Sequence, residues 1–277
     1  MTLYARNNIF RLGIVLSFLC LLICLFASLK AMSVYAPMEQ EIARRSGGLF
    51  QMLAGKWFDT NLLAVHWTIA GLVLYSFLSM ILIYYFFEKT QSPEILFVVF
   101  FAASFSLESL RLLLPLSRVY EMPSLYLLMA SRVTLFGRYF GIFSLFTASI
   151  YAVGFKAQKQ RNVVLIIAVV TLIITLGVPI DTESWDSSLN MIHGYIYMFR
   201  LIEVGAFLTT VLSFFIAAWS RSSREFVFIG TGSALAFLSR HILLNADTWA
   251  ALPTGLLLLA IGTWLICTRL HKIYLWL

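Results

Sequence analysis

The stretch MIHGYIYMFRLIEVGAFLTTVLSFFIAAW, residues 191–219, is apolar over a length that can cross a bilayer, yet it carries Arg200 and Glu203. A membrane-spanning helix needs about 20 mostly apolar residues, because each residue adds about 1.5 Å of length. The stretch therefore predicts a transmembrane helix. Its two charges predict a face turned away from lipid, because an arginine at the bilayer centre costs about 2.5–3.5 kcal/mol on insertion scales.

The rest of the chain repeats this pattern. Hydrophobic residues make up 61% of the 277 residues and charged residues 12%, whereas soluble proteins average about 45–50% and about 25%. Segments long and apolar enough to span a membrane lie at residues 12–29, 62–87, 94–116, 123–155, 163–180, 191–219, 226–244 and 251–268. We predict an all-α, polytopic membrane protein with eight transmembrane helices, because β-barrel strands would instead alternate in hydrophobicity.

Three regions organise this fold. Residues 1–30 are predicted to form a retained signal-anchor helix, because the sequence after it offers a poor cleavage site. Residues 31–61 have apolar side chains at helical spacing, which indicates an amphipathic segment at the outer interface or a plain spacer. Residues 62–277 are predicted to form a seven-helix membrane domain.

The seven-helix domain also shows a weak internal repeat. A basic or imidazole residue precedes a glycine by five positions in three helices: His66 and Gly71, Arg132 and Gly137, and Arg200 and Gly205. This spacing suggests three helical hairpins and a closing helix, with chance similarity as the alternative. The architecture loosely resembles the seven-helix membrane sensor modules of bacteria, although no motif of that family is matched residue by residue.

Charge outside the helices predicts the topology. Ten of the 20 basic residues fall in segments that would share one side: Arg6, Arg11, Lys89, Lys156, Lys159, Arg161, Arg221, Arg224, Arg269 and Lys272. Basic residues favour the cytoplasmic side, so we expect a multi-pass protein of the plasma (inner) membrane with both termini cytoplasmic. This distribution explains much of the net charge of +7 without a nucleic-acid partner.

The cysteines and the loops limit the kinds of site that this chain could contain. All three cysteines lie in predicted spans, which disfavours a disulfide framework or a cysteine-based zinc site. No metal or other cofactor is indicated. Connections between the helices are short, so any chemistry must occur among the helices. A signalling role would require another membrane protein as partner, besides the lipid bilayer itself.

The predicted spans contain more arginine than carboxylate. Arginines 111, 132, 138, 200 and 240 face only Glu108 and Glu203, and arginine does not lose its proton on burial. Buried ion pairs that join helices are one explanation. Our main hypothesis is an outward-facing pocket for an anionic small molecule or lipid headgroup, as in a sensory or interaction protein. Its predicted ligand-binding residues are Arg111, Arg132, Arg200, Arg240, Glu108, Glu203, His66 and His241.

Two other functions remain open. An anion or lipid transporter would use an intramembrane charge and glycine-broken helices. A hydrolase-like intramembrane enzyme would use Glu108 as general base with His241, which precedes Asn245 by four residues. This spacing is similar to the sparse Glu, His and Asn motifs of intramembrane proteases that process prenylated proteins, but the paired glutamates of that family are absent.

Overall fold

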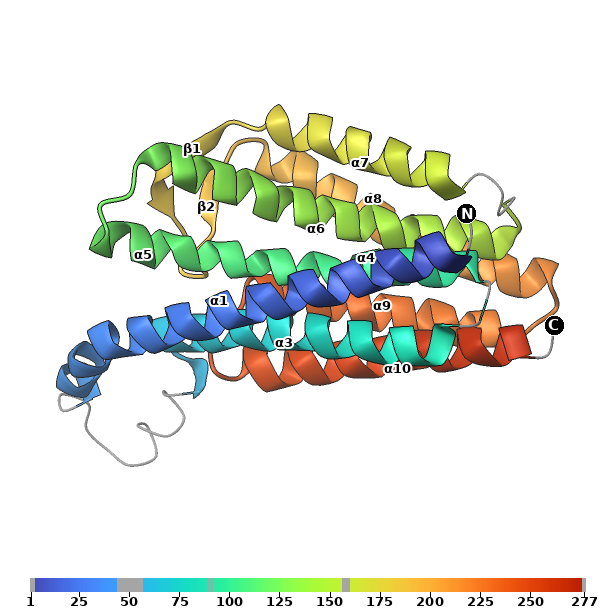
Figure 1. Ribbon diagram of the computed structural model, residues 1–277, viewed down its shortest axis with the longest axis horizontal. Coiled ribbons are helices and arrows are strands. Elements are labelled where there is room, and N and C mark those ends of the chain that lie inside the picture. Colours follow the sequence, from blue (N-terminus) through green and yellow to red (C-terminus); the bar gives the residue numbers. More distant parts are fainter. Residues whose placement is uncertain (1–2, 44–56, 89, 91, 156–159, 276–277) are drawn as a thin grey trace.

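The computed structural model describes residues 3–43, 57–88, 90, 92–155 and 160–275. These form an elongated helical bundle with a small β-hairpin at one end (Figure 1). In chain order the elements are α1 (Leu3–Ala43), α3 (Leu62–Phe87), α4 (Pro93–Ser104), the 3₁₀ helix η1 (Phe105–Leu112), α5 (Leu113–Val119), α6 (Ser124–Val153), α7 (Gln160–Leu176), β1 (Ile180–Trp185), β2 (Met191–His193), α8 (Ile196–Ser220), α9 (Glu225–Leu244) and α10 (Ala251–Leu275).

Seven spans among the described residues are long and apolar enough to cross a membrane. The predicted span at residues 163–180 is the exception, because α7 has 17 residues and ends at Leu176, before Gly177 and Pro179. The predicted count of eight spans is therefore not established. α7 nevertheless runs beside α6 and returns the chain to the end of the bundle that carries the hairpin (Figure 1).

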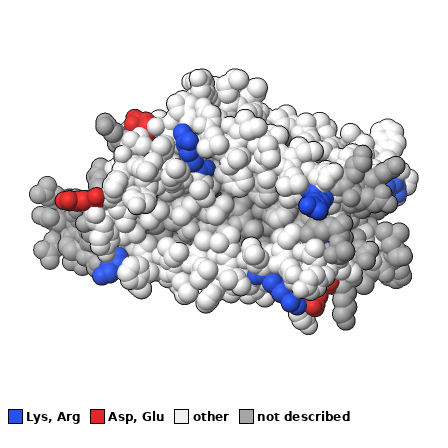
Figure 2. Space-filling view, turned by 45° about the horizontal axis from the view of Figure 1, so that its top comes forward, with Lys and Arg blue, Asp and Glu red and all other residues white. Residues whose placement is uncertain are grey.

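The exterior of the bundle suits a lipid environment. Large apolar side chains are exposed along its helices, among them Leu82, Leu201, Leu212, Leu257 and Trp264. Figure 2 shows a face with few charged side chains, and its acidic residues lie near the two ends of the molecule. The apolar helices and this surface are those of a membrane-embedded protein.

The start of α1 and the end of α10 both lie at the end of the bundle opposite the hairpin (Figure 1). Arg6 of α1 donates hydrogen bonds to the carbonyl oxygens of Phe87 and Glu88 at 2.7 and 3.0 Å. In α10, the Tyr274 hydroxyl donates to the buried Glu94 carboxylate at 2.6 Å. The side of the membrane on which this end lies stays a prediction.

α1 is longer than the predicted anchor. It continues from Leu3 to Ala43 without a helix break, so residues 31–43 extend the same helix and do not begin a separate element. The rest of the predicted interfacial segment lies mainly at residues 44–56, outside the described residues. The three-region division of the chain therefore stays a prediction.

The sequence prediction for the sixth span was wrong at its start. Residues 191–193 form β2, which pairs with β1 in an antiparallel hairpin, and α8 begins only at Ile196. Gly194 allows the base of the hairpin to close, because an added Cβ would lie 2.7 Å from Cγ of Pro179. Arg200 is consequently about 6 Å along the helix from its start, closer to the end of the span than the predicted bounds had placed it.

The central span combines α4, η1 and α5. It is the most enclosed of the seven, since 78% of its most apolar window is buried. α6 approaches it closely at two glycines: an added Cβ at Gly141 would lie 2.4 Å from Oγ of Ser104, and one at Gly137 would lie 2.8 Å from Cδ1 of Leu107. Small residues at this spacing are a common way to bring membrane helices together.

Candidate functional site

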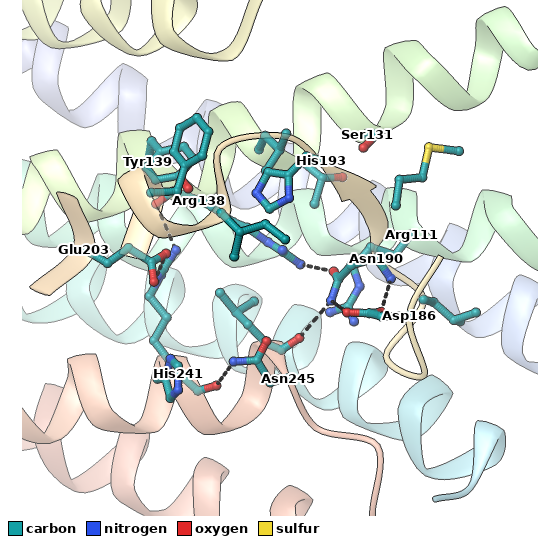
Figure 3. Close-up of a pocket in the computed structure, with 18 of the residues that line it drawn as sticks. Arg111, Ser131, Arg138, Tyr139, Asp186, Asn190, His193, Glu203, His241 and Asn245 are labelled. Atoms are coloured by element: carbon teal, nitrogen blue, oxygen red, sulfur yellow. Dashed lines mark hydrogen bonds and ion pairs between the residues drawn. The ribbon is translucent and has the colours of Figure 1, made fainter. Parts of the chain in front are cut away.

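A cavity of about 880 Å³ lies at the hairpin end of the bundle (Figure 3). Its walls come from η1 and α5, from α6, α8 and α9, and from the hairpin with its connecting loop. Cavities that bind organic ligands commonly measure about 300–1,000 Å³. This one is therefore large enough for an organic molecule.

A buried carboxylate organises the wall behind the cavity. The carboxylate oxygens of Glu108, which is 1% exposed, accept two hydrogen bonds from Arg138, both at 2.7 Å. Arg111 donates a third at 3.2 Å. Bidentate arginine pairing is the strongest form of such a contact. We call Glu108, Arg111 and Arg138 the clamp.

Local structure explains how the clamp forms. In a 3₁₀ helix residues i and i+3 lie directly above one another, so η1 places Glu108 and Arg111 together. Gly137 precedes Arg138 and allows α6 to approach η1. The sequence showed the i, i+3 spacing but not that Arg138 would supply the two shorter bonds to Glu108.

The clamp also holds the hairpin end. Arg138 donates to the Oδ1 atom of Asn190 at 2.6 Å, and Arg111 donates to the backbone carbonyl of Ser188. Asn190 in turn donates to the Oδ2 atom of Asp186 at 3.2 Å. Figure 3 shows Asn190 between Arg138 and Asp186. The loop between β1 and β2 is thus attached to the membrane helices by charged donors.

A second ion pair is less completely bonded. Arg240 of α9 donates to Glu203 of α8 and to the backbone carbonyl of Arg138, both at 3.3 Å. Charge-assisted hydrogen bonds normally measure about 2.7–2.9 Å. The side chain of Glu203 is 29% exposed, whereas that of Arg240 is 4% exposed. Arg240 is therefore a buried cation whose bonds are long.

Two further polar side chains line the cavity from α8 and α9. Arg200 and His241 are both exposed, and neither side chain has a hydrogen bond or ion pair to another described residue. Together with Arg240, they place donors along facing helices. We call Arg200, Arg240 and His241 the open cationic edge.

The charges around the cavity are more nearly balanced than the sequence suggested. Four arginines line it, against the carboxylates of Asp186 and Glu203 in the lining and Glu108 just behind it. Asp186 was missed as a site residue because it lies between the predicted spans, and the site was sought within them. One positive charge remains in excess, and it lies at the open cationic edge.

His193 contributes an imidazole to the hairpin side of the cavity. Its ring stacks on Phe199 with the centroids 5.4 Å apart. Burial is the main cause that lowers the pKa of His193 below its ordinary value of 6.5, and the positive charge of Arg138 acts in the same direction. The site thus favours a neutral imidazole.

The structure separates the predicted site residues into two groups. Arg111, Arg200, Glu203, Arg240 and His241 line the cavity. Three others are not among its lining residues: Glu108, Arg132 and His66. Arg132 lies half-buried on α6, and the Nδ1 atom of His66 lies 2.7 Å from the Leu62 carbonyl oxygen on α3.

Metal binding has no support within the described residues, where no group of three or more His, Cys, Asp or Glu side chains could hold an ion.

Comparison with models of protein families, with curated proteins and with solved structures finds no match to this chain.

Proposed function

We propose that this membrane protein binds an anionic organic ligand in the cavity at the hairpin end, in a sensory or interaction role. The observation that supports this most directly is the open cationic edge. Arg240 has only long bonds and Arg200 has no ion-pair partner among the described residues, yet both line the same cavity. Arginine binds carboxylate or phosphate oxygens through a planar pair of donors.

The clamp provides an internal comparison. Arg138 makes three bonds of 2.6–2.7 Å to side-chain oxygens, which shows how a buried arginine is satisfied in this protein. Arg240, only 4% exposed, makes bonds of 3.3 Å to Glu203 and to the Arg138 carbonyl, and none as short as those of Arg138 to any described residue. A ligand oxyanion near Arg240 and Arg200 would complete their hydrogen bonding.

An enzymatic role has less support from this geometry. Glu108 would have to act as a general base together with His241. Its carboxylate is held by two arginines and does not line the cavity. A general base must come within hydrogen-bonding distance of the proton it removes.

A sensory role would also require a partner. The described loops between the helices are short, so we expect a ligand-dependent change to pass to another membrane protein through the helices. The bilayer-facing surfaces of α8 and α10 are available for such a contact.

The proposal can be tested by titrating the purified full chain with succinate, glycerol 3-phosphate and decanoate in isothermal calorimetry. We expect at least one anion to bind the wild type, and Arg240→Gln to weaken its affinity at least tenfold. The matched control is Arg269→Gln, which removes another paired arginine, 2.9 Å from Glu225 at the opposite end of the bundle. Absence of binding by all three anions, or equal affinities in wild type and Arg240→Gln, would contradict the proposal.

A further inference from the structure

α8 and α9 form a wedge that is closed at one end and open at the cavity. Near the closed end an added Cβ at Gly230 would lie 3.2 Å from Cβ of Phe214, so the helices are in close contact. Toward the cavity, long side chains bridge the gap: Phe207 packs against Phe237 with ring centroids 5.5 Å apart, and Arg240 reaches Glu203. The space between the two helices therefore widens toward the open cationic edge.

The cavity in this wedge reaches the lipid-facing surface. Val204 lines the cavity and is 56% exposed. It shares a face of α8 with Leu201 and Leu208, which are exposed but do not line the cavity, because residues three and four apart lie on one face. Val204 is about 12 Å from the start of α8, a depth at which this face meets the apolar part of a bilayer.

The α9 side of the wedge is also apolar. Leu238 of α9 lines the cavity, is 53% exposed, and lies about 9 Å from the end of its helix at Leu244. The charged donors Arg200 and Arg240 lie nearer the helix ends than Val204 and Leu238. The cavity thus presents cations at its outer part and apolar side chains below them.

We propose that the ligand is an anionic amphiphile that enters from the bilayer. Its acid group would contact Arg200 and Arg240, and its acyl chain would lie between α8 and α9 against Val204 and Leu238. An inorganic anion would fill only a small part of a cavity of about 880 Å³. This inference rests on the proposed function, since it names the chemical class of ligand for the same site.

The test uses the full chain in phosphatidylcholine nanodiscs with hexadecanoate that carries a photoreactive diazirine in mid-chain. We expect mass spectrometry to map the cross-links to α8 and α9 near Val204 and Leu238. Arg240→Gln should reduce this labelling at least tenfold, whereas Arg269→Gln should leave it unchanged. Unlabelled octanoate, decanoate and dodecanoate should compete with affinities that rise up to about fourfold per methylene, and decanol should compete at least tenfold more weakly than decanoate.

A second variant separates the amphiphile from a water-soluble anion. Leu238→Ser should weaken labelling by hexadecanoate several-fold, while any binding of succinate or glycerol 3-phosphate is retained. Labelling spread evenly over the lipid-facing helices, and equal in wild type and Arg240→Gln, would overturn the inference. If a soluble anion still bound through Arg240, the proposed function would stand; if no anion bound at all, both proposals would fail.

Discussion

Replacing Glu108 by glutamine removes a carboxylate that is bonded to both Arg111 and Arg138. The wild-type carboxylate accepts three hydrogen bonds from them, and it is 1% exposed. Removing one partner of a buried ion pair costs about 3–5 kcal/mol, because the remaining charge stays buried without compensation. Two arginines are affected here, so we expect a loss of unfolding free energy in the upper part of that range.

The matched comparison is Glu203→Gln, which removes the carboxylate from the second ion pair. The hydrogen bond from Arg240 to Glu203 is 3.3 Å long, and the Glu203 side chain is 29% exposed. Glu203 is partly hydrated and pairs with one arginine through a long bond, whereas Glu108 pairs with two, and Arg240 keeps its bond to the Arg138 carbonyl. This variant should therefore lose less stability than Glu108→Gln.

Both variants can be measured by reversible unfolding with sodium dodecyl sulfate in mixed micelles, followed by circular dichroism. Unfolding of Glu108→Gln at the same denaturant fraction as Glu203→Gln would rule out a stabilising role for the clamp. A double variant, Glu108→Leu with Arg138→Met, should recover part of the loss, because apolar replacements remove a buried charge as well as its partner.

Two further predictions concern packing and pH. Gly141→Ala should lower the unfolding free energy by about 1–3 kcal/mol, because the new Cβ would lie 2.4 Å from Oγ of Ser104. The control is Gly205→Ala, where an added Cβ would meet no atom within 4 Å. This control should be neutral or stabilising in the same micelle assay. The folded protein lowers the pKa of His193 from 6.5, so the unfolded chain binds the proton more readily. The contribution of neutral His193 to the unfolding free energy is therefore fully present above about pH 6.5 and falls as the pH drops below it. The unfolding free energy of wild type minus that of His193→Gln should thus decrease between pH 8 and pH 5; a difference that is constant over this range would exclude His193 as the titrating group.

Apolar run length was sufficient to predict most of the helices, because a span of about 20 apolar residues has few other stable structures in lipid. The start of α8 was predicted five residues too early for the same reason. Met191 and Ile192 are apolar, and hydropathy does not distinguish a short strand from the first turn of a helix. In the loop, Asp186 accepts hydrogen bonds from the backbone amides of Ser188 and Asn190, at 3.0 and 2.7 Å. Contacts of this kind leave no periodic pattern in the sequence, so they could not be predicted from it.

The excess of arginine in the sequence drew attention to Arg111, Arg200 and Arg240, and the structure places these three along one cavity. Their role in ligand binding stays a prediction. Sequence spacing could not identify the partner of Glu203. Arg200 lies one turn away on the same helix, yet the ion pair of Glu203 is with Arg240 of α9. Such a choice depends on the rotation of each helix within the bundle.

The 3₁₀ geometry of η1 has a consequence for the length of the central span. Its eight residues occupy about 16 Å at about 2.0 Å per residue, whereas an α-helix of the same residues would occupy about 12 Å. A return of η1 to α geometry would therefore draw α4 and α5 about 4 Å closer along the axis. It would also move Glu108 out of register with Arg138 on α6, so the clamp sets the distance between the hairpin end of this span and the end where Glu94 meets Tyr274.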